Sequence, residues 1–189
     1  MDIGVEQKCL GEVDIQALSE RILSQEPEAW AEQAIRQQTY EVHKDTESIV
    51  MLFCDEGWPE EGEIYRDSGW DHLAEVAMPV IEYIIDTYYT PGGTLLRAMA
   101  AKLRAGGRIR PHRDMLRSFH MGHRVHVPIT TNEAVRFMIE GKPYNFEVGH
   151  AYELNNQKKH SVMNMGRQDR ISFIFDYVPP DQSASDMTQ

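Results

Sequence analysis

The segment Arg124-Val-His-Val-Pro-Ile-Thr130 decides how the second half of the chain is interpreted, because its side chains alternate in character. Successive side chains of a β-strand point to opposite faces, so this segment predicts one apolar face and one face with polar groups. The apolar face carries Val125, Val127 and Ile129, and the other carries Arg124, His126 and Pro128. We predict that the apolar face packs on the core. The other face is either exposed to solvent, as in many half-buried strands, or part of a site.

Similar short segments lie on both sides of this one. They alternate or are rich in β-branched residues, and turn residues such as Gly106-Gly107 and Gly141-Lys142-Pro143 separate them. The segments are Leu95–Leu103, Val135–Ile139, Ala151–Leu154, His160–Met165 and Ile171–Tyr177. Short strands at this spacing are typical of a β-sandwich or β-barrel. We therefore predict an α+β fold with a mainly β core, in which helices pack on one side of an antiparallel double sheet.

The first ninety residues are predicted to be mostly helical. A helix capped by Asp14 and a second short helix beginning at Pro27 fit the usual start signals. Residues 73–88 carry apolar side chains at the i, i+3, i+4 spacing of an amphipathic helix, and Pro79 lies off this stripe. We expect residues 1–93 to form a helical support region.

Two further segments interrupt the helical region. Ser48–Cys54 is predicted to be a buried strand, and Asp55–Gly69, which is acidic and contains Gly and Pro, is predicted to be a loop. The chain has 189 residues, a length typical of one domain. We expect a single domain over residues 1–177, with its core over 94–177, and a flexible tail over 178–189.

The formal net charge of −11 is unevenly distributed along the chain. Residues 1–90 hold 5 Lys and Arg against 21 Asp and Glu, whereas residues 91–189 hold 14 against 9. An acidic chain is not expected to bind nucleic acid in general, and no apolar stretch reaches the length of a membrane span. The basic second half instead indicates a site for small anions. Two cysteines cannot form a disulfide framework, and no signal-peptide pattern is present, so we expect a cytoplasmic protein.

A candidate metal site begins with His112-Arg113-Asp114. In an extended segment, residues i and i+2 point to the same side, so His112 and Asp114 can reach one point. This pair alone is weak evidence, since a hydrogen bond in a surface turn explains it equally well. His160, however, opens a later predicted strand. Two histidines and one carboxylate make the facial triad that binds non-haem Fe(II).

Arg170 opens the last predicted strand and fits the same scheme. A facial triad leaves three positions on the iron open, which suits O₂ together with a cosubstrate that chelates through two oxygens. A dicarboxylate bound in this way needs a cation for its far carboxylate. The guanidinium of Arg presents a fork of donors that matches carboxylate geometry, so Arg170 is a candidate for this role.

Several segments, in this order, resemble the aspartyl/asparaginyl β-hydroxylase family. They are Gly106–Asp114, Arg124–Ile129, Val148–Asn156, His160–Asn164 and Arg170. The resemblance covers roughly residues 94–177 and is looser before them. It implies a double-stranded β-helix, which is the jelly-roll fold of the cupins, and an oxygenase that depends on Fe(II) and 2-oxoglutarate.

The resemblance also implies a role for each candidate residue. The residues that would bind iron and form the catalytic centre are His112, Asp114 and His160. Arg170 would pair with the distal carboxylate of 2-oxoglutarate, and Arg124 and His126 would contact its metal-side carboxylate. Some members of the family have Gly where this chain has Asp114, so this chain has the more ordinary facial triad and need not share their substrates.

The resemblance therefore implies a dioxygenase that hydroxylates an unactivated C–H bond and gives succinate and CO₂. The expected substrate is an amino acid or an aspartyl/asparaginyl-type side chain, presented as a small molecule or a short peptide. We expect no nucleic-acid or membrane partner. One alternative is a non-catalytic, cupin-like module that binds a metal or a dicarboxylate. A zinc hydrolase on the same ligands is disfavoured, because zinc sites seldom need a distant arginine for a dicarboxylate.

Overall fold

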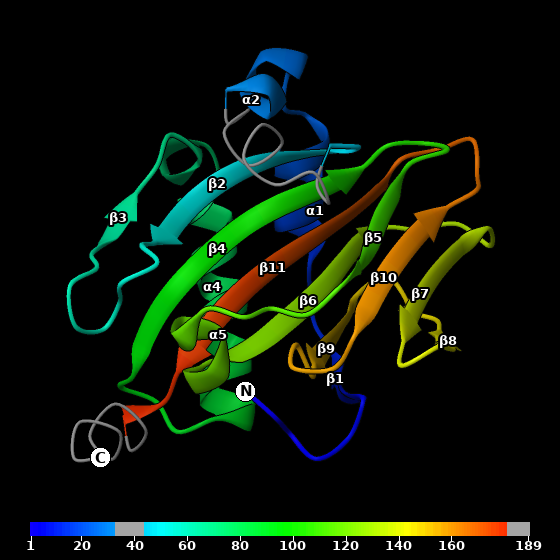
Figure 1. Cartoon of the computed structure of the whole chain (residues 1–189). Coiled ribbons are helices and arrows are strands. Elements are labelled where there is room, and N and C mark those ends of the chain that lie inside the picture. The colour runs from blue at the N-terminus through cyan, green and yellow to red at the C-terminus, as the bar shows by residue number, and fades with distance from the viewer. Residues whose placement is uncertain (33–43, 181–189) are drawn as a thin grey trace.

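Two antiparallel β-sheets form the core of the protein in a computed structural model that describes residues 1–32 and 44–180 (Figure 1). The larger sheet has the order β1-β9-β6-β11-β4-β2-β3, and the smaller has the order β5-β10-β7-β8. The strands of the larger sheet are β1 (Gln7–Glu12), β2 (Thr46–Cys54), β3 (Ile64–Arg66), β4 (Thr94–Leu103), β6 (His123–Thr130), β9 (His150–Leu154) and β11 (Arg170–Val178). The strands of the smaller sheet are β5 (Arg108–His112), β7 (Val135–Ile139), β8 (Lys142–Tyr144) and β10 (His160–Asn164).

The path of the chain between the sheets identifies the fold. From β4 onward the chain passes from one sheet to the other, with β4, β6, β9 and β11 in the larger sheet and β5, β7, β8 and β10 in the smaller. Eight antiparallel strands divided in this way between two facing sheets form a double-stranded β-helix, or jelly roll. The predicted fold class is therefore confirmed. β1, β2 and β3 extend the larger sheet at its two edges.

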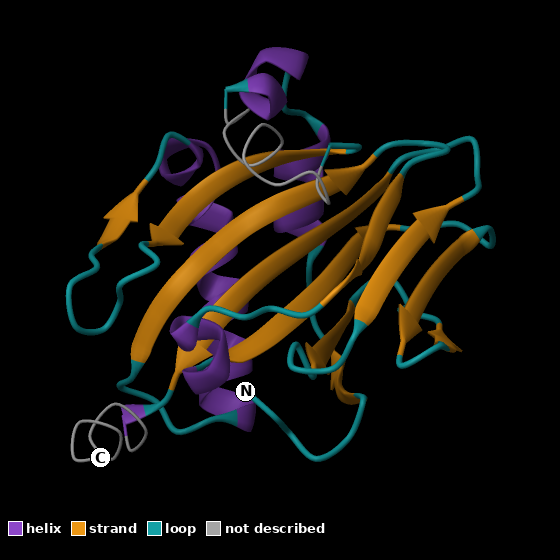
Figure 2. Cartoon of the chain, viewed as in Figure 1, coloured by secondary structure: helices purple, strands orange, loops and turns teal. Residues whose placement is uncertain are grey.

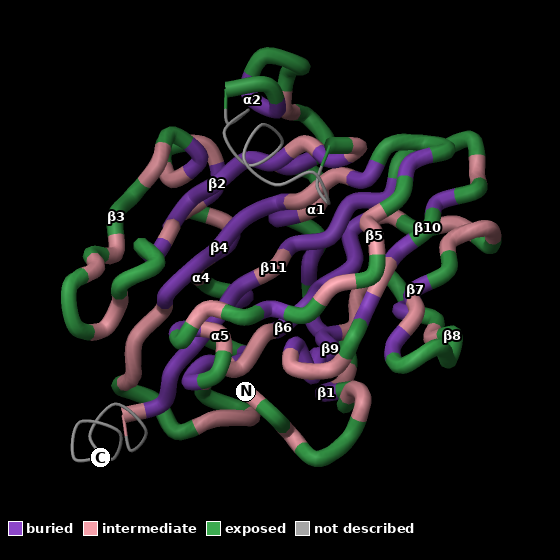
Figure 3. The backbone as a smooth tube through the Cα atoms, in the orientation of Figure 1, coloured by how far each residue is buried: buried purple, intermediate pink, exposed green. Residues whose placement is uncertain are grey.

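Helices from the first ninety residues cover the face of the larger sheet that points away from the smaller sheet (Figure 2). The helices in the described residues are α1 (Gln16–Leu23), α2 (Pro27–Ala31), α4 (Gly69–Tyr88) and α5 (Arg117–Met121). Apolar side chains of α1 and α4 share one buried cluster with Val125, Val127 and Ile129, as the alternation of this strand predicts. Figure 3 shows buried residues following β4 and β11 through the molecule.

Some local predictions were wrong. β3 lies within Asp55–Gly69, which we predicted to be a loop, and β1 was not predicted at all. Both are edge strands with at most one buried residue, so they lack the alternation that identifies a half-buried strand. The N-cap of α1 is Ile15 rather than Asp14, although the Asp14 carboxylate still accepts a hydrogen bond from the Gln16 N–H (3.0 Å).

The remaining predictions on organisation concern the ends of the elements. β11 runs one residue beyond the predicted end of the domain at position 177, and residues 181–189 of the expected tail lie outside the described part of the chain. The single-domain division therefore stays a prediction.

Both cysteines are free thiols. None of the helices in the described residues is long and apolar enough to cross a membrane.

Gly69 allows the N-terminus of α4 to lie directly against β2. A methyl group added at its Cα would lie 2.4 Å from the carbonyl oxygen of Val50, which is backbone and cannot rotate away. We expect Gly69→Ala to lower the free energy of unfolding by about 1–3 kcal/mol, despite the higher helix propensity of Ala. Urea denaturation followed by circular dichroism measures the change. Unchanged or increased stability would contradict this close packing of α4 on β2.

Candidate metal centre

The three predicted metal ligands meet between the two sheets. His112 ends β5, Asp114 follows two residues later, and His160 begins β10. His112 and His160 are register partners, and their ring centroids lie 4.3 Å apart. One donor atom from each of the three residues lies within 4.8 Å of the others, and His112 Nε2 is 3.8 Å from Asp114 Oδ1. This arrangement can hold one metal ion.

A β-bulge in β5 directs His112 into the interior. His160 and Val162 are two residues apart on β10, whereas their partners His112 and Ile109 are three residues apart on β5. The extra residue lets both partners face inward, which strict alternation would not allow. Ile109 packs against the core between the sheets, and His112 lines the adjoining cavity. The bulge therefore lets this edge strand supply a core residue and a metal ligand.

Backbone carbonyls orient the two imidazole rings. His112 Nδ1 lies 2.8 Å from the carbonyl oxygen of Arg110, and His160 Nδ1 lies 3.0 Å from that of Lys158. A carbonyl oxygen only accepts hydrogen bonds, so each Nδ1 carries the proton and each Nε2 keeps a lone pair for a metal. Burial also lowers the pKa of His160 to about 4, which keeps this ring neutral near pH 7.

Asp114 is fixed by its backbone and by one carboxylate oxygen. Its N–H donates to the carbonyl oxygen of Asn156 (3.1 Å). Its Oδ2 accepts a hydrogen bond from Arg124 Nη1 at 2.5 Å, whereas Oδ1 is the oxygen near His112. Asp114 can therefore offer Oδ1 to a metal while Oδ2 stays bound to Arg124.

Arg124 lies on the inner face of β6 and has two carboxylate partners. Besides Asp114, it binds Asp176 through Nε (2.7 Å) and Nη2 (2.8 Å). Burial alone would lower the pKa of Arg124, but these two carboxylates raise it above its ordinary value. The predicted contact of Arg124 with the metal-side carboxylate of 2-oxoglutarate stays a prediction.

Three further side chains on the inner face of the larger sheet have buried polar atoms with no hydrogen-bond partner among the described residues. These atoms are both ring nitrogens of His126, Nη2 of Arg170 and the hydroxyl oxygen of Ser172. Arg170 is only 4% exposed, and burial without a neighbouring carboxylate lowers its pKa to about 10. A buried cation is costly unless an anion pairs with it, so this group of side chains fits a carboxylate ligand.

Ser172 and Asp176 were missed in the sequence. The last strand was predicted, but only Arg170 was singled out in it. Residues i, i+2, i+4 and i+6 of a strand share one face, so the signal was the series Arg170, Ser172, Ile174, Asp176. Arg170, Ser172 and Asp176 are all buried polar side chains in a strand that is otherwise apolar.

Two cavities share Phe137 and Arg170 in their linings. The inner cavity also has His112, His160 and His126 in its lining, and its volume is about 60 Å³.

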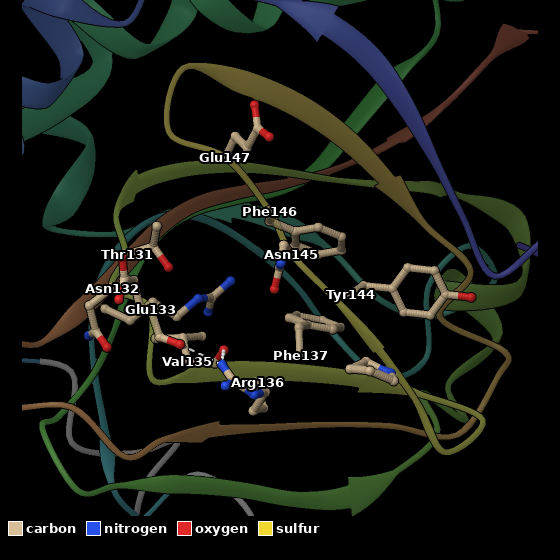
Figure 4. Close-up of a pocket in the computed structure, with 12 residues that line it drawn as sticks. Thr131, Asn132, Glu133, Val135, Arg136, Phe137, Tyr144, Asn145, Phe146 and Glu147 are labelled. Carbon is tan, nitrogen blue, oxygen red and sulfur yellow. Dashed lines mark hydrogen bonds between the residues drawn. The ribbon is translucent and has the colours of Figure 1, made fainter.

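The outer cavity has a volume of about 690 Å³ and lies along β7, β8 and residues 145–147. Figure 4 shows Phe137 and Phe146 facing one another across it, with ring centroids 4.6 Å apart. None of the three candidate metal ligands lines it, so the candidate chemistry belongs to the smaller cavity.

His126 is expected to make stability depend on pH. Burial lowers its pKa well below 6.5, so it takes up a proton mainly in the unfolded chain as the pH falls below 6.5. The free energy of unfolding therefore decreases with falling pH, by up to about 1.4 kcal/mol at pH 5.5 from this group. His126→Gln should remove this part of the change in urea denaturation between pH 7.5 and 5.5. The same pH dependence in both proteins would contradict the assignment.

Comparison with known proteins adds to this geometry. A family model described as aspartyl/asparaginyl beta-hydroxylase matches residues 20–180. A search of curated proteins finds no match.

Among solved structures, an oxidoreductase of the 2OG-Fe(II) oxygenase family from Burkholderia pseudomallei is 12% identical, with a TM-score of 0.55 over 70% of this chain and 67% of that one. A viral collagen prolyl hydroxylase from Paramecium bursaria Chlorella virus-1, in a 2-oxoglutarate complex, is 8% identical, with a TM-score of 0.56 over 93% and 97%. A non-heme monooxygenase in a nickel complex is 13% identical, with a TM-score of 0.57 over 93% and 74%. At these identities, the similarity concerns the fold.

Proposed function

The chain belongs to the aspartyl/asparaginyl β-hydroxylase family, and we propose that it hydroxylates an unactivated C–H bond of an amino acid or of an aspartyl/asparaginyl-type side chain. It is a dioxygenase that uses Fe(II) and 2-oxoglutarate. In the proposed reaction, one atom of O₂ becomes the hydroxyl group of the product and the other enters succinate, while 2-oxoglutarate loses CO₂. The substrate would be a small molecule or a short peptide.

One observation carries the proposal. A single cavity is lined both by two of the candidate metal ligands, His112 and His160, and by Arg170, a buried guanidinium with no carboxylate partner among the described residues. A metal centre and a cation on one cavity suit a ligand that chelates a metal at one end and carries a carboxylate at the other. 2-Oxoglutarate is such a ligand.

Each residue then has a role in the proposed site. The residues that would hold the iron are His112, Asp114 and His160. Arg170, with the Ser172 hydroxyl, would bind the distal carboxylate, and His126 and Arg124 would contact the carboxylate next to the metal. When bound, Fe(II) supplies the activation of O₂ that is coupled to the oxidation of 2-oxoglutarate.

The protein itself would position and shield the reactants. The carbonyls of Arg110 and Lys158 fix the two imidazole rings, so the metal would meet preoriented donors. The ring of Phe137 lies parallel to that of His160 and edge-on to that of His126. It forms an apolar part of the wall of the inner cavity beside these two histidines. Such a wall would limit the access of water to the reacting groups.

The test follows the cosubstrate and the product separately. Without O₂, Fe(II) and 2-oxoglutarate together should give a weak visible charge-transfer band. With O₂, a panel of free amino acids, short Asp- and Asn-containing peptides and cell extract should include a substrate that stimulates succinate formation and gains 16 Da. A protein that shows the band but forms no succinate with any member of the panel would instead support the cupin-like binding module.

A further inference from the structure

A row of charged side chains crosses three strands of the larger sheet beside the candidate metal centre. Asp176 on β11 is the register partner of Arg97 on β4 and of Arg124 on β6. Asp176 and Arg97 are each 2% exposed. Asp176 Oδ2 lies 3.4 Å from Arg97 Nη1, and Arg124 connects the row to Asp114.

We propose that Asp176 is a positioning residue for the metal centre, acting through Arg124 on the carboxylate of Asp114. This inference rests on the proposed metal site and extends it to a residue that does not touch the metal. The two hydrogen bonds from Arg124 to Asp176, at 2.7 and 2.8 Å, fix the plane of the guanidinium. Nη1 is then left to point at Asp114 Oδ2, which turns Oδ1 toward His112.

The same row also holds the segment that follows Asp114. The ring of Phe119 on α5 lies between the two arginines, with its centroid 4.3 Å from Cζ of Arg97 and 4.4 Å from Cζ of Arg124. Arg97 Nη2 donates to the Ser118 hydroxyl at 2.9 Å. α5 is thereby attached to the row, and the short connection from Asp114 to α5 has little freedom to move.

The charges of the row give a second reason for this role. Arg97, Asp176, Arg124 and Asp114 alternate in sign and sum to zero, so a divalent cation at Asp114 would approach a neutral group. Without the charge of Asp176, the guanidinium groups of Arg97 and Arg124 would act on the cation with only one carboxylate to offset them. Loss of Asp176 should therefore weaken metal binding through both orientation and repulsion.

The decisive variant is Asp176→Asn, which keeps the shape of the side chain and removes its charge. Co(II) is the probe, since its visible absorption reports ligand geometry and needs neither 2-oxoglutarate nor turnover. We expect Co(II) affinity to fall about 10–100-fold and the absorption spectrum to change. The matched control is Glu153→Gln, another buried carboxylate of the same sheet. Its register partner Val125 packs on the helical side, so this variant should leave both readouts unchanged.

A second variant keeps the test decisive if Asp176→Asn does not fold. Arg124→Lys retains the positive charge but cannot bind Asp176 with a fork and Asp114 at the same time, so the spectrum should change in the same direction. Wild-type affinity and spectrum in a folded Asp176→Asn protein would overturn the inference and leave the proposed function intact. If the wild-type protein itself binds no Co(II) that depends on His112, the proposed metal site and this inference both fail.

Discussion

Replacing His112 with Ala is expected to abolish succinate formation and to weaken Co(II) binding by more than about 100-fold. Removal of a ligand should cost more than the 10–100-fold that changes around a ligand cost. The effect should be specific, because His112 is a partly exposed residue at the end of an edge strand and its loss leaves the core between the sheets in place. Isothermal titration with Co(II) and an assay of succinate measure the two effects.

A second histidine serves as the control for this experiment. His72 on α4 lies on the helical side of the molecule, outside the linings of both cavities described above, and His72→Ala should leave metal binding and succinate formation unchanged. Tight binding of one Co(II) per chain by the His112→Ala protein would place the metal elsewhere.

Replacing Arg170 with Gln is expected to raise the Kd for 2-oxoglutarate about 10–150-fold while leaving Co(II) binding unchanged. A charge-assisted hydrogen bond is worth about 1.5–3 kcal/mol, which corresponds to this range of affinities. The variant should also be at least as stable as the wild type without ligand, because it removes a buried charge that has no carboxylate partner among the described residues. Titration with 2-oxoglutarate and urea denaturation give the two readouts.

Arg136 provides the matched control for Arg170. Both line the outer cavity, but Arg136 is exposed and does not line the inner one. Arg136→Gln should therefore leave the Kd for 2-oxoglutarate unchanged. If Arg136→Gln weakens binding and Arg170→Gln does not, the cosubstrate binds in the outer cavity, and the assignment of the inner one is wrong.

The antiparallel double sheet could be predicted from the sequence because its central strands alternate in character or are rich in β-branched residues, whereas the jelly roll was implied by the resemblance to a known family. Val125, Val127 and Ile129 lie on the core as their spacing requires. β1 and β3 could not be predicted, since edge strands bury too little to impose a pattern. α5 was not predicted from the sequence either. It is a helix of five residues held by contacts of Ser118 and Phe119 with Arg97, which is distant in sequence.

The candidate site could be predicted in part. His112, Asp114 and His160 were singled out as the residue types of a facial triad and by the resemblance to a known family, and the structure places their donor atoms together. Alternation counted in steps of two does not reveal the bulge in β5, because only the pairing with β10 defines it. The pairing of Arg124 with Asp176 could not be predicted for the same reason, because it requires β6 and β11 to be neighbours in the sheet.

The uneven distribution of charge along the sequence also has a structural explanation. Part of the positive charge of the second half is paired with acids of the first half, and does not face a ligand. Lys102 and Arg104 both bind Glu47, and Arg117 binds Glu60. Arg97 and Arg124 both pair with Asp176, an acid of the second half. Arg170 remains as the cation best placed for an anion. The predicted anion site therefore depends on this residue and not on the basic second half as a whole.

The four outer edges of the sheets bear on how the protein behaves at high concentration. An unpaired strand edge can recruit another chain and begin aggregation, and proteins counter this with short strands, bulges, charges and proline. Each edge strand has such a feature. β1 has an irregular register at Gly11, β3 and β8 have three residues each, and β5 carries Pro111 beside its bulge. The irregular edge that directs His112 inward is therefore also a poor template for intermolecular β-sheet.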